Sequence, residues 1–205
     1  MREPEVQVWW GSLLDADHQL LELLDATERA RITALERPAD RGRSMVGAAL
    51  LRTAVADDLG CSPAGVELDR TCPECGDPHG RPRVIGPLPA SRTTPPWVSV
   101  SHSGHLVVVV LCPTHPVGVD VQRISDVDHG VDPGDWVEAE ARLKSGITDE
   151  ASSDQTCRID TPVAGYAAAV TVTHGPGRTL GQPLGRPALV QRTWHHPSAA
   201  VDAPG

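Results

Sequence analysis

The chain has 205 residues, of which 40% are hydrophobic and 22% charged, and its formal net charge is -9 at pH 7. This size and composition predict a globular protein with room for one large domain or two small lobes. The acidic balance argues against general nucleic-acid binding, which requires a basic face. The longest apolar run, 106–112, is too short to cross a bilayer, and residues 1–15 lack a signal peptide's pattern, so we expect a cytoplasmic protein with no membrane partner.

The N-terminal third is predicted to be helical. Residues 15–24 have apolar side chains at helical spacing, and residues 40–59 form a longer helix that Gly60 ends. Between them, Asp25 and Glu28 form a capping box, in which each side chain binds a free backbone N–H at a helix start. Arginines crowd this region, which suits a small phosphorylated ligand or an acidic partner. They are Arg29, Arg31, Arg37, Arg41, Arg43 and Arg52.

The middle of the chain changes to the alternating pattern of strands. Residues 97–101 alternate, a Ser-Gly turn follows at 103–104, and residues 106–111 return as a buried strand. In the next strand, over 117–122, the valines face one side while Asp120 and Gln122 face the other.

The last third of the chain predicts one helix, one strand and a tail. A second capping box, starting at Asp135, precedes a helix over 136–144. Residues 147–158 are predicted to be loop, and residues 165–173 a strand of small residues. Residues 174–205 contain five glycines and five prolines, a composition that rarely builds a core, so we expect a disordered tail.

Three charged side chains are candidates for catalysis. Asp120, an acid between valines on a strand, is either a functional group or a strand-end residue that faces solvent. Glu140 and Lys144, four residues apart on one helix face, are either an ordinary surface pair or part of a site. Lys144 is the only lysine among the 18 basic residues. A compact ammonium acts differently from a planar guanidinium, which favours a function for Lys144.

A histidine is a further candidate. His102 lies between Ser101 and Ser103 at a strand end beside a turn. Its imidazole is either a packed, hydrogen-bonded side chain or a donor to a phosphate.

A cysteine pair has the spacing of half a zinc site. Cys72 and Cys75 enclose a Pro-Glu dipeptide, and His79 follows four residues later. A closed structural site needs four ligands, and no other residue has diagnostic spacing. A plain tight turn and an oxidisable pair remain the alternatives. Five cysteines without a secretory signal argue against a disulfide framework.

A series of segments, taken in order, resembles the surfactin-synthetase type of 4'-phosphopantetheinyl transferase. The resemblance covers about residues 8–173 and leaves the tail outside. Each motif alone is weak, and their order makes the signal specific. The segments are ERAR (28–31) with DRGRSMVGAALLR (40–52), HGRPR (79–83), VSVSHSG (98–104), PVGVDV (116–121), WVEAEARLK (136–144) and GYAAAV (165–170).

The resemblance implies an α+β fold of two similar lobes related by a pseudo-two-fold, with coenzyme A between them. The lobes would span 1–112 and 113–173, followed by the tail at 174–205. A monomer of this family would transfer the 4'-phosphopantetheine arm of coenzyme A to a serine of an acyl, polyketide or peptidyl carrier protein.

The resemblance also implies roles for individual residues. Asp120 and Glu140 would hold Mg²⁺ against the pyrophosphate of coenzyme A, with Gln122 as a weaker ligand. Glu140 would accept the proton of the carrier serine, and Lys144 would neutralise charge on the transferring phosphate. The phosphates of coenzyme A would be bound by His102 with Ser101, by Arg43 and Arg81, and with help from Arg31.

Three features depart from the family pattern. Gln122 stands where a second acid is usual, and Ala139 stands where a lysine usually precedes the glutamate. Only 20 positions separate Asp120 from Glu140, a stretch that normally holds one or two more helices. A non-catalytic relative that binds coenzyme A or a carrier protein is therefore an alternative, and a zinc-stabilised interaction module is another.

Overall fold

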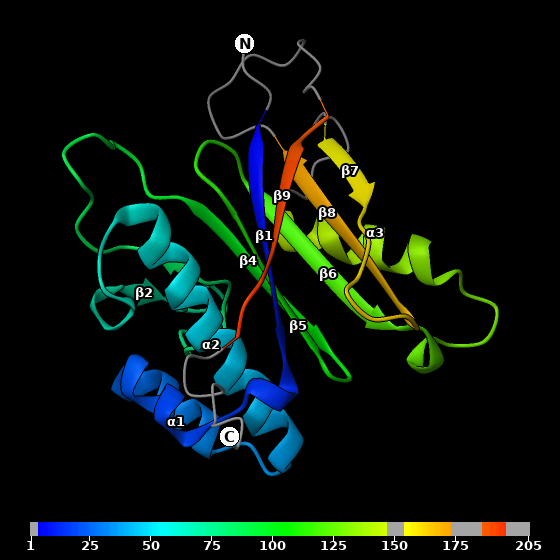
Figure 1. The fold of residues 1–205 in the computed structure, drawn as a ribbon, viewed down its shortest axis with the longest axis horizontal. Coiled ribbons are helices and arrows are strands. Elements are labelled where there is room, and N and C mark those ends of the chain that lie inside the picture. Colours follow the sequence, from blue (N-terminus) through cyan, green and yellow to red (C-terminus); the bar gives the residue numbers. More distant parts are fainter. Residues whose placement is uncertain (1–3, 147–153, 174–185, 196–205) are drawn as a thin grey trace, which may run out of the picture.

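The computed structural model describes residues 4–146, 154–173 and 186–195. Two sheets pack against each other, and helices cover their outer faces (Figure 1). The first sheet has the strand order β4-β5-β1-β9, and the second has the order β6-β8-β7. The strands are β1 (Glu5–Ser12), β4 (Trp97–Ser103), β5 (Leu106–Cys112), β6 (Val117–Arg123), β7 (Asp154–Arg158), β8 (Tyr166–Thr173) and β9 (Ala188–Thr193), with β2 (Leu68–Asp69) and β3 (Arg83–Val84) forming a small ribbon.

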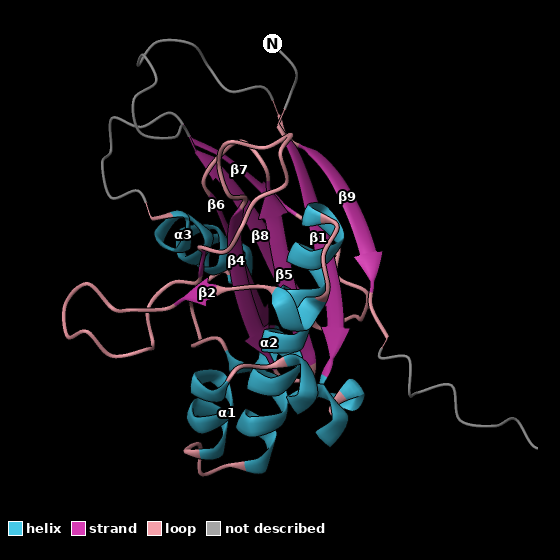
Figure 2. Ribbon diagram, turned by 90° about the vertical axis from the view of Figure 1, so that its left-hand side faces the viewer, coloured by secondary structure: helices cyan, strands magenta, loops and turns pink. Residues whose placement is uncertain are grey.

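Three α-helices lie outside the sheets. Helices α1 (Ala26–Thr33) and α2 (Pro38–Leu59) lie side by side on the first sheet's side, and α3 (Pro133–Ser145) packs on β6 and β8 (Figure 2). No helix in the described part of the chain combines the length and the apolar character needed to cross a bilayer. The shorter 3-10 segments are η1 (Leu13–Asp15), η2 (His18–Leu23), η3 (Pro63–Gly65) and η4 (Ile124–Asp126).

The two sheets repeat one connectivity. In each, a strand is followed by a helix and then by two strands, of which the last lies in the middle and is antiparallel to both neighbours. This applies to β1-α2-β4-β5 and to β6-α3-β7-β8. The predicted α+β fold of two similar lobes is therefore confirmed.

The core has two large layers. One lies between α2 and the first sheet, and the other lies between the two sheets. Strand β5 is buried at all seven of its positions because α2 covers one face and the second sheet covers the other. A strand that is buried on both faces has apolar side chains at every position, and residues 106–112 show this continuous apolar sequence.

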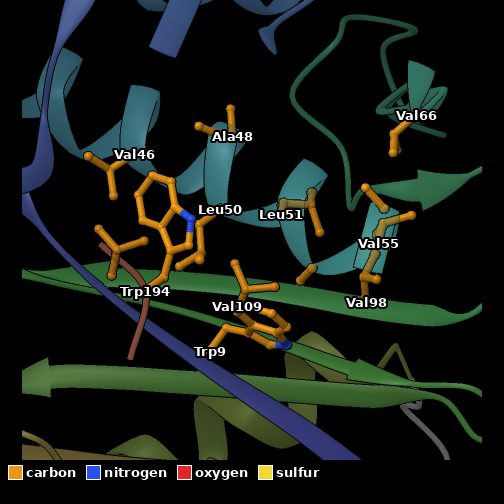
Figure 3. Packing of buried hydrophobic residues seen from close by; sticks show 14 of the residues in the cluster. Trp9, Val46, Ala48, Leu50, Leu51, Val55, Val66, Val98, Val109 and Trp194 are labelled. Carbon is orange, nitrogen blue, oxygen red and sulfur yellow. The ribbon is translucent and has the colours of Figure 1, made fainter. Parts of the chain in front are cut away.

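The structure contradicts the prediction of a disordered tail at residues 186–195. Strand β9 pairs in parallel with β1, in the register Glu5 to Ala188 through Trp10 to Thr193. Trp194 follows it, is 8% exposed, and lies against Val46 and Leu50 of α2 (Figure 3). The sequence pattern missed this strand because its residues are mostly exposed and show no core-facing alternation. Residues 174–185 and 196–205 lie outside the described part of the chain.

Other local predictions need smaller corrections. Residues 154–158, predicted as loop, form β7 because they pair with β8. Residues 13–23 form 3-10 segments instead of an α-helix. The last helix begins at Pro133, and its N-cap is Asp132, not Asp135. Proline suits the first helical position, where its missing N–H costs nothing. The capping box of Asp25 and Glu28 is confirmed.

Candidate active site

Side-chain hydrogen bonds join the two lobes along β4 and β6. These edge strands belong to different sheets, and buried serines of β4 bridge them. Because the serines recur every second residue, all three hydroxyls point to the same side of β4. The hydroxyls of Ser99, Ser101 and Ser103 accept hydrogen bonds from the backbone N–H groups of Val119, Val121 and Arg123, at 3.2, 3.3 and 3.0 Å. This register brings Ser101 next to Asp120.

Helix α3 approaches β6 most closely at Gly118. A Cβ added there would lie 2.0 Å from the carbonyl oxygen of Ala141 and 2.4 Å from the nitrogen of Ser145. Only glycine fits, because no side-chain carbon can lie so close to backbone atoms. This contact brings the C-terminal turn of α3, with Lys144, over the strand that carries Asp120.

Asp120, Lys144 and Ser101 form one polar cluster. The carboxylate of Asp120 is 4% exposed, and its Oδ1 accepts hydrogen bonds from Ser101 Oγ at 2.7 Å and from Lys144 Nζ at 2.5 Å. Lys144 Nζ also donates to Ser101 Oγ at 3.1 Å. A buried carboxylate needs such partners, because an uncompensated charge away from water is costly. The predicted catalytic lysine and the predicted metal-binding acid are thus in direct contact.

A polar cavity of about 200 Å³ lies where α1, α2, β4 and α3 meet. Its lining includes four basic side chains, from both lobes, and two serines. Such a site suits an anion with several negative oxygens. The residues that line it are Arg31, Ser44, Gly47, Ala48, Arg70, Val100, Ser101, His102 and Lys144. Four of the predicted site residues are therefore brought together: Arg31, Ser101, His102 and Lys144.

Arg70 is the cavity residue that the sequence did not single out. Its Nε atom is buried and has no hydrogen-bond partner among the residues that the structure describes. Burial, followed by the nearby charge of Arg31, lowers the pKa of Arg70 to about 10. A bound anion in the cavity would offset the repulsion between the positive charges of Arg70 and Arg31. Nothing in the local sequence separates Arg70 from the other arginines, because only the fold turns its side chain toward Arg31.

His102 lines the same cavity. Desolvation of the ring, followed by the positive charge of Arg43, lowers the pKa of His102 below its ordinary value of 6.5. The neutral imidazole still carries one N–H that can donate to a phosphate oxygen.

Two of the predicted phosphate ligands have protein partners instead. Arg43 donates to the carbonyl of Gly104 at 2.9 Å and forms an ion pair with Asp40. Arg81 donates to the carbonyl of Ser145 and, at 2.8 Å, to that of Val117. Neither lines the cavity. Arg81 instead ties the end of α3 and the start of β6 to the first lobe, and a phosphate contact for either arginine stays a prediction.

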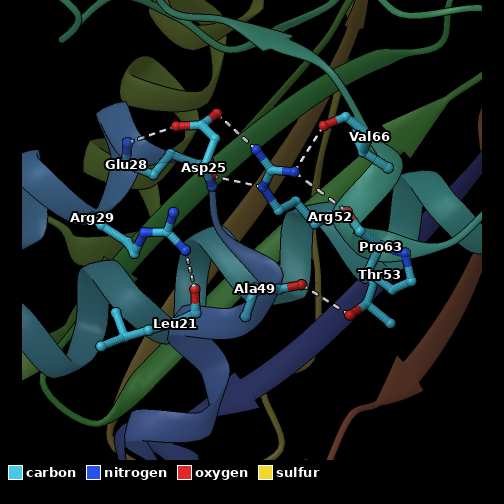
Figure 4. Close-up of polar contacts among 9 residues, drawn as sticks. All are labelled: Leu21, Asp25, Glu28, Arg29, Ala49, Arg52, Thr53, Pro63 and Val66. Carbon is cyan, nitrogen blue, oxygen red and sulfur yellow. Dashed lines mark hydrogen bonds and ion pairs between the residues drawn. The ribbon is translucent and has the colours of Figure 1, made fainter.

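A third arginine is buried in a structural network beneath α1. Arg52 is 1% exposed and pairs with Glu28 at 2.7 Å and with Asp25 at 2.8 Å (Figure 4). It also donates to the carbonyl oxygens of Val66 at 2.7 Å and Pro63 at 3.3 Å. The basic surface expected in this region is therefore smaller than the count of arginines suggests, and Arg52 holds α1 and the residues around η3 to α2.

A second hollow, of about 890 Å³, lies beside Arg81 and has mainly apolar walls. Trp97 and Ile85, which are 36% and 60% exposed, stand at its rim, and the guanidinium of Arg81 lies 5.8 Å from the Trp97 ring. None of the predicted catalytic residues lines it.

Comparison with known proteins decides the family. Residues 9–114 match the family model described as 4'-phosphopantetheinyl transferase, N-terminal. The chain belongs to this family. A phosphopantetheinyl transferase of Thraustochytrium sp. (strain ATCC 26185 / S-3) is 36% identical over 110 residues, which is 53% of this chain. The chain spans about a third of the length of that relative, as the match covers 35% of it.

Most of the residues that line the cavity lie within the segment that matches the transferase family. Arg31, Arg70, Ser101 and His102 all lie within residues 9–114. Asp120, Glu140 and Lys144 lie beyond it, in the second lobe. The link between β6 and α3 forms only η4 and a short loop, so the extra helices usual in the family are missing there.

The predicted magnesium ligands are only partly assembled. Asp120 Oδ1 accepts hydrogen bonds from Lys144 Nζ and Ser101 Oγ, so this oxygen is already engaged by protein groups. Glu140 is half-buried on α3, one turn before Lys144, and its carboxylate makes no hydrogen bond or ion pair within the described residues. Gln122 lies two residues after Asp120 on β6. These oxygen donors fit a hard cation that keeps several waters.

Proposed function

We propose that this protein transfers the 4'-phosphopantetheine arm of coenzyme A to a serine hydroxyl of a carrier protein. The observation that carries the proposal is the cavity lined by Arg31, Arg70, His102 and Lys144, which adjoins the buried carboxylate of Asp120. A cluster of cationic and neutral donors next to an acid is what phosphate binding and phosphoryl transfer require.

The phosphates of coenzyme A would occupy this cavity. Arg70 and Arg31 supply guanidinium groups, and His102 supplies a neutral N–H. The cavity is large enough for phosphate groups but not for the whole of coenzyme A, so the pantetheine arm would extend out of it. Lys144, on α3, lies at the end of the cavity that leads to Asp120.

The transfer is a displacement at the β-phosphorus of coenzyme A. The serine oxygen of the carrier protein bonds to that phosphorus, and the bond to the bridging oxygen breaks, which releases 3',5'-ADP with the electron pair. Glu140 accepts the serine proton, because its carboxylate is the free base on the face of α3 that also carries Lys144. Lys144 moves part of its contact from Asp120 to the transferring phosphate and stabilises its negative charge.

Magnesium fits the same site as a cofactor. Asp120, Glu140 and, more weakly, Gln122 would hold it, and a bound Mg²⁺ supplies charge neutralisation on the pyrophosphate.

The direct test is the intact mass of an apo carrier protein after incubation with this protein, coenzyme A and Mg²⁺. We expect a gain equal to one phosphopantetheine, and no gain when Mg²⁺ is chelated. Carriers of the acyl, polyketide and peptidyl types are tested in parallel, because the carrier surface is the least defined part of the site. The absence of a gain with every carrier type would contradict the proposal.

A second candidate function is that of a relative that binds coenzyme A without turnover. The contact of Lys144 with Asp120 favours it, since the two groups neutralise each other in place of a metal ion. Gln122 and Ala139, which replace charged residues of the family pattern, also favour it. Tight binding of coenzyme A without any mass gain on carrier proteins would select this function over the first.

A further inference from the structure

The loop between β2 and β3 brings together two thiols and an imidazole. Cys72 is 9% exposed, whereas Cys75 and His79 are exposed. Their ligand atoms all lie within 4.8 Å of one another, and Cys75 Sγ is 2.9 Å from His79 Nε2. All three residues stand outside the cavity and the Asp120 cluster, so the proposed transfer reaction leaves them unexplained.

The backbone of this loop is folded around the Cys72 sulfur. Gly76, with a φ of 81°, donates its N–H to the carbonyl of Cys72 at 2.9 Å, and Cys72 donates its own N–H to the carbonyl of Asp77 at 2.8 Å. The backbone N–H groups of Cys75 and Glu74 point at the Cys72 sulfur. Backbone donors of this kind favour a thiolate, which is the form that binds metals.

We propose that Cys72, Cys75 and His79 bind a zinc ion, whose fourth ligand is water. Two thiolates and an imidazole are soft and borderline donors, which suit zinc and not Mg²⁺ or Ca²⁺. Around a tetrahedral zinc, sulfur at about 2.3 Å and nitrogen at about 2.0 Å lie roughly 3.5 Å apart. The three side chains therefore need only small rotations to bind the ion, and the exposed side of the cluster leaves room for water.

The zinc ion would fix the loop that connects Arg70 of the cavity to Arg81. Arg70 lies two residues before Cys72, and its carbonyl accepts a hydrogen bond from the N–H of Gly80 at 2.7 Å. A Cβ on Gly80 would lie 2.8 Å from the carbonyl of Thr71, so the two ends of the loop meet where only glycine fits. Arg81 follows directly. Closing the loop with a metal thus holds Arg70 toward the cavity and Arg81 on the end of α3.

Metal content of the full chain tests the binding claim without reference to transfer. The protein is produced in zinc-supplemented medium, purified with a reductant that does not bind metals, and measured by mass spectrometry of the metal. We expect about one zinc per chain in the wild type. Cys75→Ser and His79→Ala, both at exposed positions, should lose it, whereas Cys61→Ser, at an exposed cysteine outside the cluster, should keep it. A wild type without zinc, or zinc that persists in both cluster variants, would overturn the proposal.

Cobalt supplies a second readout of the ligands. Replacing zinc with Co²⁺ should give a thiolate-to-cobalt charge-transfer band and strong visible bands of a tetrahedral ion. The charge-transfer band should weaken in Cys75→Ser, whereas only the visible bands should shift in His79→Ala. A weak octahedral spectrum in the wild type would contradict the proposed ligand set.

The predicted effect of zinc on Arg70 in the cavity rests on the proposed function, and it is measured in a separate experiment. Binding of 3',5'-ADP is measured by calorimetry for the wild type and for Cys75→Ser. We expect several-fold weaker binding in the variant, because Arg70 loses its support. Equal affinities, with zinc bound only in the wild type, would refute the positioning effect and leave the metal site standing. If neither protein binds 3',5'-ADP, the proposed function fails and the zinc result still stands.

Discussion

Replacing Trp194 with alanine should strongly destabilise the protein, although the residue lies in a segment without an evident core pattern. Trp194 is 8% exposed and packs against α2. Its backbone N–H also donates to the carbonyl of Trp10 at 2.7 Å, which continues the pairing of β9 with β1. The indole covers Gly11, where an added Cβ would lie 3.6 Å from its ring.

The size of the effect follows from the buried area. A tryptophan of this kind buries about 150–250 Å². At about 25 cal/mol per Å², and allowing for partial burial in the unfolded chain, the loss is about 3–5 kcal/mol. Measured substitutions of buried tryptophan by alanine fall in the same range of about 3–5 kcal/mol.

Urea unfolding followed by far-UV circular dichroism is the assay, since it does not depend on the fluorescence of the residue removed. With a slope of about 2 kcal/mol per M, the midpoint should fall by roughly 2 M. Trp136→Ala is the matched control, because the same atoms are removed from a side chain that is 44% exposed, and its midpoint should fall by clearly less. A Trp194→Ala midpoint within about 0.5 M of the wild type would refute the docking of β9 and Trp194.

Four further outcomes are expected. Arg52→Ala leaves the buried Glu28 without its ion-pair partner, so the free energy of unfolding should fall by about 3–5 kcal/mol. Thermal or urea unfolding measures this loss, and a value below about 1 kcal/mol would contradict the network in Figure 4. Glu140→Gln should abolish transfer by the mass assay while coenzyme A still binds within several-fold, and unchanged turnover would remove Glu140 as the base. Lys144→Arg should transfer much more slowly with unchanged circular dichroism, because the guanidinium is larger and planar; equal rates would remove the need for an ammonium. Because the pKa of His102 is lowered from its ordinary value, its ring gains charge only under more acidic conditions, so 3',5'-ADP should bind more tightly as the pH falls through the acidic range. His102→Gln should flatten that pH profile in calorimetry.

Predictions made from neighbouring residues agree well with the structure. The capping box of Asp25 and Glu28 and the end of α2 at Gly60 depend on contacts within one helical turn. The alternation over 117–122 correctly places Asp120 on the face opposite the core valines. That this face meets Ser101 of the other lobe is known only from the structure. Lys144 is conspicuous in the sequence as the only lysine, and the structure brings it to Asp120.

The sequence by itself thus determined the capping box of Asp25 and Glu28, the end of α2 at Gly60 and the alternation of β6, because each depends on residues close together in the chain. Only the tertiary structure decided that β9 joins β1, since the paired residues are far apart in sequence and mostly exposed. It alone turned Arg70 toward the cavity, directed Arg81 to the end of α3, and closed the serine contacts between the lobes. These features arise from pairing and desolvation between distant segments, and no local pattern of residues records which segments will meet.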